Sequence, residues 1–231
     1  MTNPKWLQRA LVFTLLAHVA ASAAMGLVLL PGMPGGPNAE PLARAAYMAA
    51  HPALWRTGFF FWHLVSASDL LLSLALLGAL PRGKRGPAVL ALLGTGIALA
   101  LEQPPEILWQ TRMMDLAREA AATGDAGRFA ALEHTLYLVL AAGSTVAWSL
   151  TAICWSWCLA RLGIWHRALT PFSAVLWGLF VVLGLAPLAP PAWVPPLAVV
   201  AGNVLGFAAM TVWFAWVVKL ALWPVKPESC G

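Results

Sequence analysis

"PAVLALLGTGIALALEQPPEILW", residues 87–109, is an apolar run of membrane-spanning length that ends in two carboxylates and two prolines. About 20 apolar residues in a helix cross the hydrocarbon of a bilayer, and residues 87–101 carry no charged side chain. Proline lacks the N–H that an interior helical residue donates, so Pro104 and Pro105 predict that the helix kinks or stops there. The stretch therefore predicts a membrane helix whose last turns hold acidic groups.

The composition of the whole chain agrees with a membrane protein. Of the 231 residues, 61% are hydrophobic and only 10% are charged, and the mean hydropathy is +0.77. These values exclude an ordinary soluble domain. The net charge of +5 comes from basic residues spread singly between apolar runs, which does not indicate a nucleic-acid partner. We expect the lipid bilayer to be the main partner.

Six stretches are long and apolar enough to form membrane-spanning helices. They are residues 8–30, 56–80, 87–108, 129–160, 171–189 and 195–222. Together they predict one all-α, polytopic transmembrane bundle over residues 1–231, with both termini on the same side. The first run resembles a signal peptide at "ASAAMG" but stays apolar through "LVLLPG", so we expect it to be retained.

The basic residues of two connections set the expected orientation. "PRGKRG", residues 81–86, has three basic residues and no acid, and "RLGIWHR", residues 161–167, has two more arginines. The positive-inside rule places both connections, and both termini, in the cytoplasm. Tryptophans near the expected span ends are interpreted as headgroup-level residues: Trp6, Trp165 and Trp223 on the inner side, and Trp55, Trp109 and Trp193 on the outer side. We expect a multi-pass protein of a bacterial inner membrane.

Two segments outside the spans have helical character. "LARAAYMAAHPALW" begins at Leu42 and is expected to form a short helix that stops before Pro52. "QTRMMDLAREAAA", residues 110–122, places apolar residues on one helical face and charged residues elsewhere. Both segments are predicted to be short amphipathic helices on the outer face of the bundle.

Ionisable side chains inside the spans are the candidates for function. A carboxylate at the bilayer centre costs on the order of 2.5–3.5 kcal/mol, so each one needs protein or water around it. His63, Ser66 and Asp69 recur every third residue and can face one cavity. Glu102 lies about 22 Å along its helix from residue 87, and Glu106 lies at the membrane boundary.

The fourth span is expected to supply partners for Glu102. Glu133 and His134, near its start, are predicted to reach the same depth, and a 3.5-residue seam from His134 to Cys158 predicts a polar and aromatic stripe facing the bundle. The sequence therefore predicts a cavity in the outer half of the membrane. Its candidate residues are His63, Asp69, Glu102, Glu106, Glu133 and His134.

Three classes of function suit these residues. Imidazoles and carboxyls can handle protons, a cation or a small ligand, which favours a binding or transport-like protein. One alternative is a structural or accessory subunit of a larger complex, or a homo-oligomer, that packs through Gly202, Asn203 and Gly206. The other is an intramembrane enzyme using metal or acid–base chemistry. No compact metal motif is present, so the sequence predicts no metal centre or cofactor and favours a role other than catalysis.

Two stretches resemble a known bacterial family. "LWRTGFFFWHLVSASDLLLSLALLGAL", with Arg56, Gly58 and Asp69, resembles the small polytopic membrane proteins classed as domain of unknown function 4386. "RLGIWHRALTP" is similar to the Arg/Lys-x-Gly, Pro-Arg, Leu pattern of that family. The matching positions are Arg161, Gly163, Arg167 and Leu169, while His166 replaces the family's proline. The resemblance implies an all-helical bundle of about six spans and no established activity.

Overall fold

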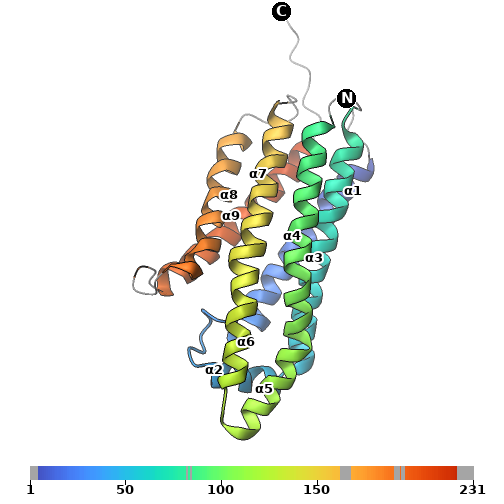
Figure 1. The fold of residues 1–231 in the computed structure, drawn as a ribbon. Coiled ribbons are helices and arrows are strands. Elements are labelled where there is room, and N and C mark those ends of the chain that lie inside the picture. The colour runs from blue at the N-terminus through green and yellow to red at the C-terminus, as the bar shows by residue number, and fades with distance from the viewer. Residues whose placement is uncertain are drawn as a thin grey trace, which may run out of the picture.

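The protein is an all-helical bundle, as its composition predicts. The computed structural model describes residues 5–81, 83, 85–161, 168–189, 193 and 196–222, and it describes the side chains of all of these except 196–200, 202–203 and 219–222. In this part of the chain every regular element is helical. Helix α1 begins and helix α9 ends at the same end of the bundle, which is the upper end in Figure 1.

Helices cover all six predicted spans. They are α1 (Lys5–Ala24), prolonged by η1 (Met25–Leu29) and η2 (Leu30–Gly32); α3 (Pro52–Ala79); α4 (Gly86–Gln110); α6 (Gly127–Leu138), η4 (Val139–Ser144) and α7 (Thr145–Arg161) in one run; α8 (Leu169–Leu185) with η5 (Ala186–Leu188); and α9 (Pro196–Leu222). Within the described residues, five of these runs are long and apolar enough to cross a membrane, and α9 contains the shorter apolar stretch Val204–Val218. The prediction of an all-α transmembrane bundle is confirmed.

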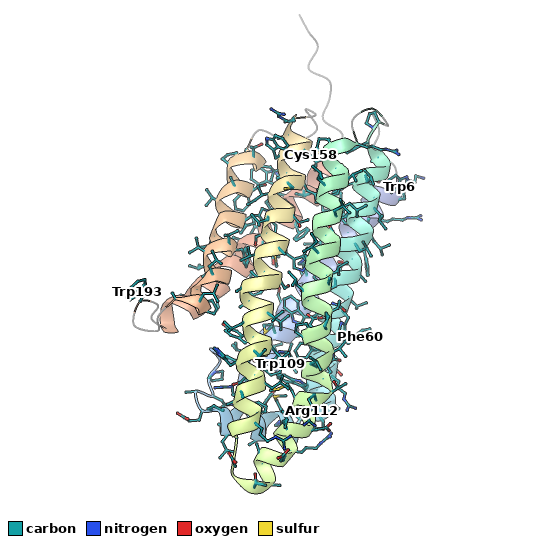
Figure 2. The ribbon with its side chains drawn as sticks, viewed as in Figure 1. Trp6, Phe60, Trp109, Arg112, Cys158 and Trp193 are labelled. Atoms are coloured by element: carbon teal, nitrogen blue, oxygen red, sulfur yellow. The ribbon has the colours of Figure 1, made fainter. Side chains whose placement is uncertain are left out.

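The helices of the bundle differ in length, and this divides the molecule into two parts. The run from Gly127 to Arg161 has 35 residues and is about 52 Å long, whereas α8 with η5 is about 30 Å long, which matches the hydrocarbon of a bilayer. Because η4 contacts both α8 and η5, α6 extends beyond the end of α8. Figure 2 shows Trp193 at the turn between α8 and α9, short of the level of Trp109 and Arg112.

We call the projecting part, residues 25–59 and 109–138, the cap. It contains two further helices, α2 (Pro41–Ala50) and α5 (Arg112–Thr123), which pack against each other. Its core is apolar and consists of Leu29, Met33, Ala45, Met48, Trp55, Phe59, Trp109, Met113, Met114, Leu116, Ala117, Ala120, Phe129 and Leu136. The two short helices predicted outside the spans are therefore present, and the apolar face of α5 is buried against protein.

Two tryptophans assigned to the membrane boundary belong to the cap core instead. Trp55 and Trp109 are fully buried, their ring centroids lie 5.8 Å apart, and the Trp55 Nε1–H donates a hydrogen bond to the Trp109 carbonyl at 3.0 Å. The interpretation of these two rings as headgroup-level residues is wrong, because the helices that carry them continue beyond the end of α8. Trp6 and Trp193 are exposed, and Trp165 and Trp223 lie outside the described residues.

Helix α4 runs without interruption through its two prolines to Gln110. Of the two expected outcomes, a kink or a stop, the stop at Pro104 does not occur. Proline itself adopts the backbone angles of a helix, and its cost comes from the hydrogen bond that its missing N–H would have made and from the contact of its ring with the carbonyl four residues earlier. Side chains hold the following turns together, since Gln103 Nε2 donates to Glu106 Oε2 at 3.1 Å and Gln110 Nε2 donates to the Glu106 carbonyl at 3.2 Å.

Helices α4 and α7 approach each other closely at Gly94. A Cβ atom at this position would lie 2.6 Å from Thr151 Oγ1. We expect Gly94→Val to lower the free energy of unfolding in detergent by about 1–3 kcal/mol, the usual cost of overpacking. Gly96→Val is the matched control, because nothing lies within 4 Å of the added Cβ there. Equal unfolding midpoints for the two variants in a denaturant titration would contradict the close contact.

Candidate functional site

A cavity of about 290 Å³ lies inside the bundle. It reaches from Glu102 and Ser144, on the side of the cap, to Leu159 and Leu169 near the opposite end, and six helices line it. Most of its wall is leucine, tryptophan and phenylalanine, while its ionisable side chains among the described residues are His18, Asp69 and Glu102. Ser144, Trp148, Thr151 and Trp155 line it too, which confirms this part of the stripe predicted for the fourth span, whereas His134 at its start is exposed.

Glu102 is held in the cavity wall by donors from two neighbouring helices. The side chain is buried, and its Oε2 accepts hydrogen bonds from Ser66 Oγ on α3 at 2.6 Å and from Trp148 Nε1 on α7 at 3.0 Å. Two donors on one carboxyl oxygen stabilise a negative charge there, and a proton on this group would sit on Oε1. The geometry therefore gives the carboxyl a partner inside the bundle in either state.

Hydrogen bonds continue from Glu102 toward the cap. Gln103 Nε2 donates to Ser66 Oγ at 2.8 Å and to Glu106 Oε2 at 3.1 Å. His63 Nδ1 faces two acceptors, Gln103 Oε1 at 2.8 Å and Glu106 Oε2 at 3.2 Å, so it carries a hydrogen. We call His63, Ser66, Glu102, Gln103 and Glu106 the carboxyl–histidine cluster.

The cluster is reached from the surface through His63. Its side chain is 30% exposed, whereas that of Glu106 is 4% exposed. Gln110 Nε2 lies 2.6 Å from His63 Nε2, and an amide nitrogen can only donate, so the imidazole is neutral in this arrangement. A proton arriving at His63 Nε2 would require the Gln110 amide to turn and present its oxygen. Trp109 and Arg112, labelled in Figure 2, belong to the cap.

Asp69 and His18 form a second pair of ionisable groups farther from the cap. His18 Nδ1 donates to the Thr14 carbonyl at 2.9 Å, which leaves Nε2 directed at Asp69 Oδ2 across 3.6 Å. That distance is longer than a hydrogen bond. The Phe214 ring of α9 covers the imidazole at a centroid distance of 4.4 Å. His18 therefore presents to the carboxyl the nitrogen that can take up a proton.

Glu133 and His134 do not belong to the cavity. Arg44 of α2 donates from Nε to Glu133 Oε1 at 2.7 Å and from Nη2 to Oε2 at 2.5 Å, inside the cap. Arg44 also donates to the carbonyls of Asn38 and Ala39. His134 is exposed. The expectation that these two residues of the fourth span partner Glu102 is wrong, and Trp148 takes that place.

The reason is the length of the fourth helical run. Along a helix, the separation of Glu133 from Trp148 corresponds to about 22 Å. The prediction assumed that the fourth span begins at the membrane surface, which places Glu133 at the depth of Glu102. The observed helical run begins in the cap, so Glu133 lies in the cap instead. Sequence reasoning also did not assign Gln103 or Arg44 to any partner. A signal for Gln103 was available, since it lies three residues before Glu106 on the same helix face.

The predicted packing motif of the last helix is described only in part. A Cβ at Gly206 would lie 3.0 Å from the Phe180 ring of α8, so this glycine allows α8 and α9 to approach closely. The surroundings of Gly202 and the side chain of Asn203 lie outside what the structure describes. In the described part of the chain, no three His, Cys, Asp or Glu side chains form a group able to hold a metal ion.

Comparisons with protein-family models, with curated proteins and with solved structures gave no match for this chain. The resemblance to the family classed as domain of unknown function 4386 stays a prediction. The class of protein, a helical membrane bundle, follows from the helices and their hydropathy. Any function has to be argued from the geometry of the cavity and the cluster.

Proposed function

We propose that the protein is an integral membrane protein of the binding or transport class, in which Glu102 takes up and releases a proton or a small cation at the cavity wall. One observation carries the proposal: the Glu102 carboxyl lines the cavity and is also hydrogen-bonded into the cluster that leads to the partly exposed His63. A carboxyl sheltered inside a membrane span marks an ion or proton pathway by default.

The layout of the polar groups supports a route with two ends. On the cap side, His63 and Glu106 exchange protons with the surface, and Gln103 and Ser66 orient the groups between them and Glu102. On the other side, the cavity continues from Glu102 past Asp69 toward the far end of the bundle. Acidic and histidine side chains within membrane spans form proton relays in pumps and transporters.

The same proposal includes the location and orientation. The basic connection at residues 81–86 and the arginines of residues 161–167 favour a cytoplasmic position for that end of the bundle. The cap then projects from the outer face of a bacterial inner membrane, and both termini are cytoplasmic. The carboxyl–histidine cluster opens toward the outside in this orientation.

The proposal is tested by proton movement across a reconstituted membrane. Liposomes containing the protein and a trapped pH-sensitive dye receive a step in external pH. We expect the wild type to speed equilibration and Glu102→Gln to return it to the rate of protein-free liposomes, because the amide cannot release a proton. Glu119→Gln removes an exposed carboxyl of the cap and is expected to behave like the wild type.

The controls separate proton exchange from damage to the fold. Glu102→Gln keeps the size of the side chain and an oxygen that can accept from Ser66 and Trp148, so its unfolding midpoint is expected to stay close to that of the wild type. A folded Glu102→Gln variant that equilibrates as fast as the wild type would overturn the proposal. An accessory or structural role would then explain the buried polar groups better.

A further inference from the structure

The charged side chains of the cavity wall indicate the chemistry of a ligand that could bind there. Asp69 and Glu102 both line it, and within the described residues its wall contains no lysine or arginine. The remaining wall is dominated by apolar and aromatic side chains. An anion would meet two acidic groups and no fixed positive charge, whereas a cation with an apolar body would match both the carboxyls and the wall.

Asp69 offers the clearest contact point for a ligand. Its side chain keeps 17% of its surface accessible although it lies in the interior of the bundle, and it contributes to the cavity wall. His18 Nε2 lies 3.6 Å from Asp69 Oδ2, and among the described residues no group donates a hydrogen bond to this carboxyl. An ionised carboxyl in an apolar cavity without a donor is costly, so this group either holds a proton or is partnered by a bound cation.

Aromatic rings of α8 and α9 line the same cavity as this carboxyl and begin at its neighbour His18. Phe214 lies against His18, the Trp213 and Phe214 centroids are 5.0 Å apart, and the Trp177 and Trp213 centroids are 5.4 Å apart. Trp177, Trp213 and Phe214 all line the cavity. The faces of such rings attract organic cations, and quaternary ammonium groups in particular, because the ring quadrupole places negative charge on the face.

We infer that the cavity binds a lipophilic organic cation, an amine or quaternary ammonium with a small aromatic or branched apolar body, whose charge rests between Asp69 and the rings of Trp213 and Phe214. This deepens the proposed function by naming the class of ligand, and it rests on the same cavity. The charge is neutralised by Asp69, and Glu102 at the cap side of the cavity provides the second acidic group along the route.

The test compares two probes of the same shape that differ only in charge. Benzyltrimethylammonium is the cation, and neopentylbenzene is its neutral carbon counterpart. The full-length protein in lipid nanodiscs is titrated with each probe at neutral pH while tryptophan fluorescence is recorded, since five tryptophans are among the described residues that line the cavity. We expect saturable binding of the cation, at least about tenfold tighter than that of the neutral probe.

Two further results follow from the same site. Asp69→Asn is expected to weaken binding of the cation by about tenfold and to leave binding of the neutral probe unchanged.

Binding of the cation is expected to weaken as the pH falls, because neutral carboxyls at Asp69 and Glu102 offer no opposite charge and a protonated His18 repels the ligand. His18 on α1 and Glu102 on α4 are the titratable groups that face Asp69 among the described lining residues of the other helices.

The comparison remains decisive even if Asp69→Asn does not fold, because the wild-type protein binds both probes in the same assay. Equal affinity for the two probes, or no saturable binding of the cation, would overturn the inference. Its failure is separate from that of the proposed function, since proton exchange through Glu102 is measured without any ligand. Proton exchange with no cation binding would therefore remove the ligand class alone.

Discussion

Arg44→Met is expected to lower the free energy of unfolding by about 3–5 kcal/mol. Arg44 and Glu133 are 6% and 3% exposed, and the guanidinium donates to both carboxylate oxygens of Glu133. Methionine fills much of the same space but removes the opposite charge, so a buried carboxylate is left without its partner. The carbonyls of Asn38 and Ala39 also lose their donor. Denaturant titration of the purified protein in detergent measures the change.

An exposed ion pair of the same cap provides the matched control. Arg128 donates to Glu119, and these side chains are 65% and 46% exposed. Arg128→Met is expected to cost less than about 1 kcal/mol, because water screens the pair and solvates the carboxylate that remains. The double variant Arg44→Met with Glu133→Leu should recover much of the loss, since no buried charge then lacks a partner. Equal losses for Arg44→Met and Arg128→Met would contradict the buried pair.

The stability of the cap matters for the candidate site because the two are physically connected. The cap core reaches α4 through Trp109, whose carbonyl accepts from Trp55, and Gln110 at the end of α4 contacts His63. The position of Glu106, one turn earlier, is fixed by the same end of the helix. The Arg44 pair therefore supports the part of the protein through which the carboxyl–histidine cluster is reached.

The membrane helices were predictable from the sequence because the signal is simple. A run of about 20 apolar residues has few other stable uses in a protein, and each of the six runs is helical in the structure. The predicted end of the third span, residue 108, lies close to the end of α4 at Gln110. A stop at the prolines does not occur, because the local rule omits the side chains of Gln103 and Gln110 that hold the next turns.

The cap was only partly predictable. The amphipathic pattern of residues 112–123 indicated a helix, and the structure has α5 there. The same pattern suits a helix on a lipid surface and a helix packed on protein, and the position of α2 decides between them. Trp55 and Trp109 illustrate the same ambiguity, because a large aromatic residue near the end of an apolar run suits either a headgroup layer or a hydrophobic core.

For the candidate site, the acidic residues were predictable and their partners were not. Glu102 and Asp69 stand out because charge is rare in such runs, and both line the cavity. Which residues face them depends on how far each helix is shifted along its neighbour. Hydropathy does not determine that shift when a helix continues beyond the membrane, as α6 does, so Trp148 replaces Glu133 beside Glu102.

The central claim is that Glu102, inside the membrane, exchanges a proton while it is held by Ser66 and Trp148. Infrared spectra of the protein in lipid, recorded through a pH titration, report this directly, because a protonated carboxyl has its own carbonyl band. The Glu102→Gln variant identifies the contribution of Glu102 by difference. Glu40→Gln, at an exposed carboxyl of the cap loop, is the control.

We expect one component of the protonated-carboxyl band to gain and lose intensity with pH in the wild type and in Glu40→Gln, and to be absent from Glu102→Gln, while the components of the other carboxyls remain. Trp148→Phe should move its frequency, because one of the two donors to the carboxyl is removed. Spectra of Glu102→Gln that match the wild type at every pH would show that Glu102 exchanges no proton, and would contradict the account.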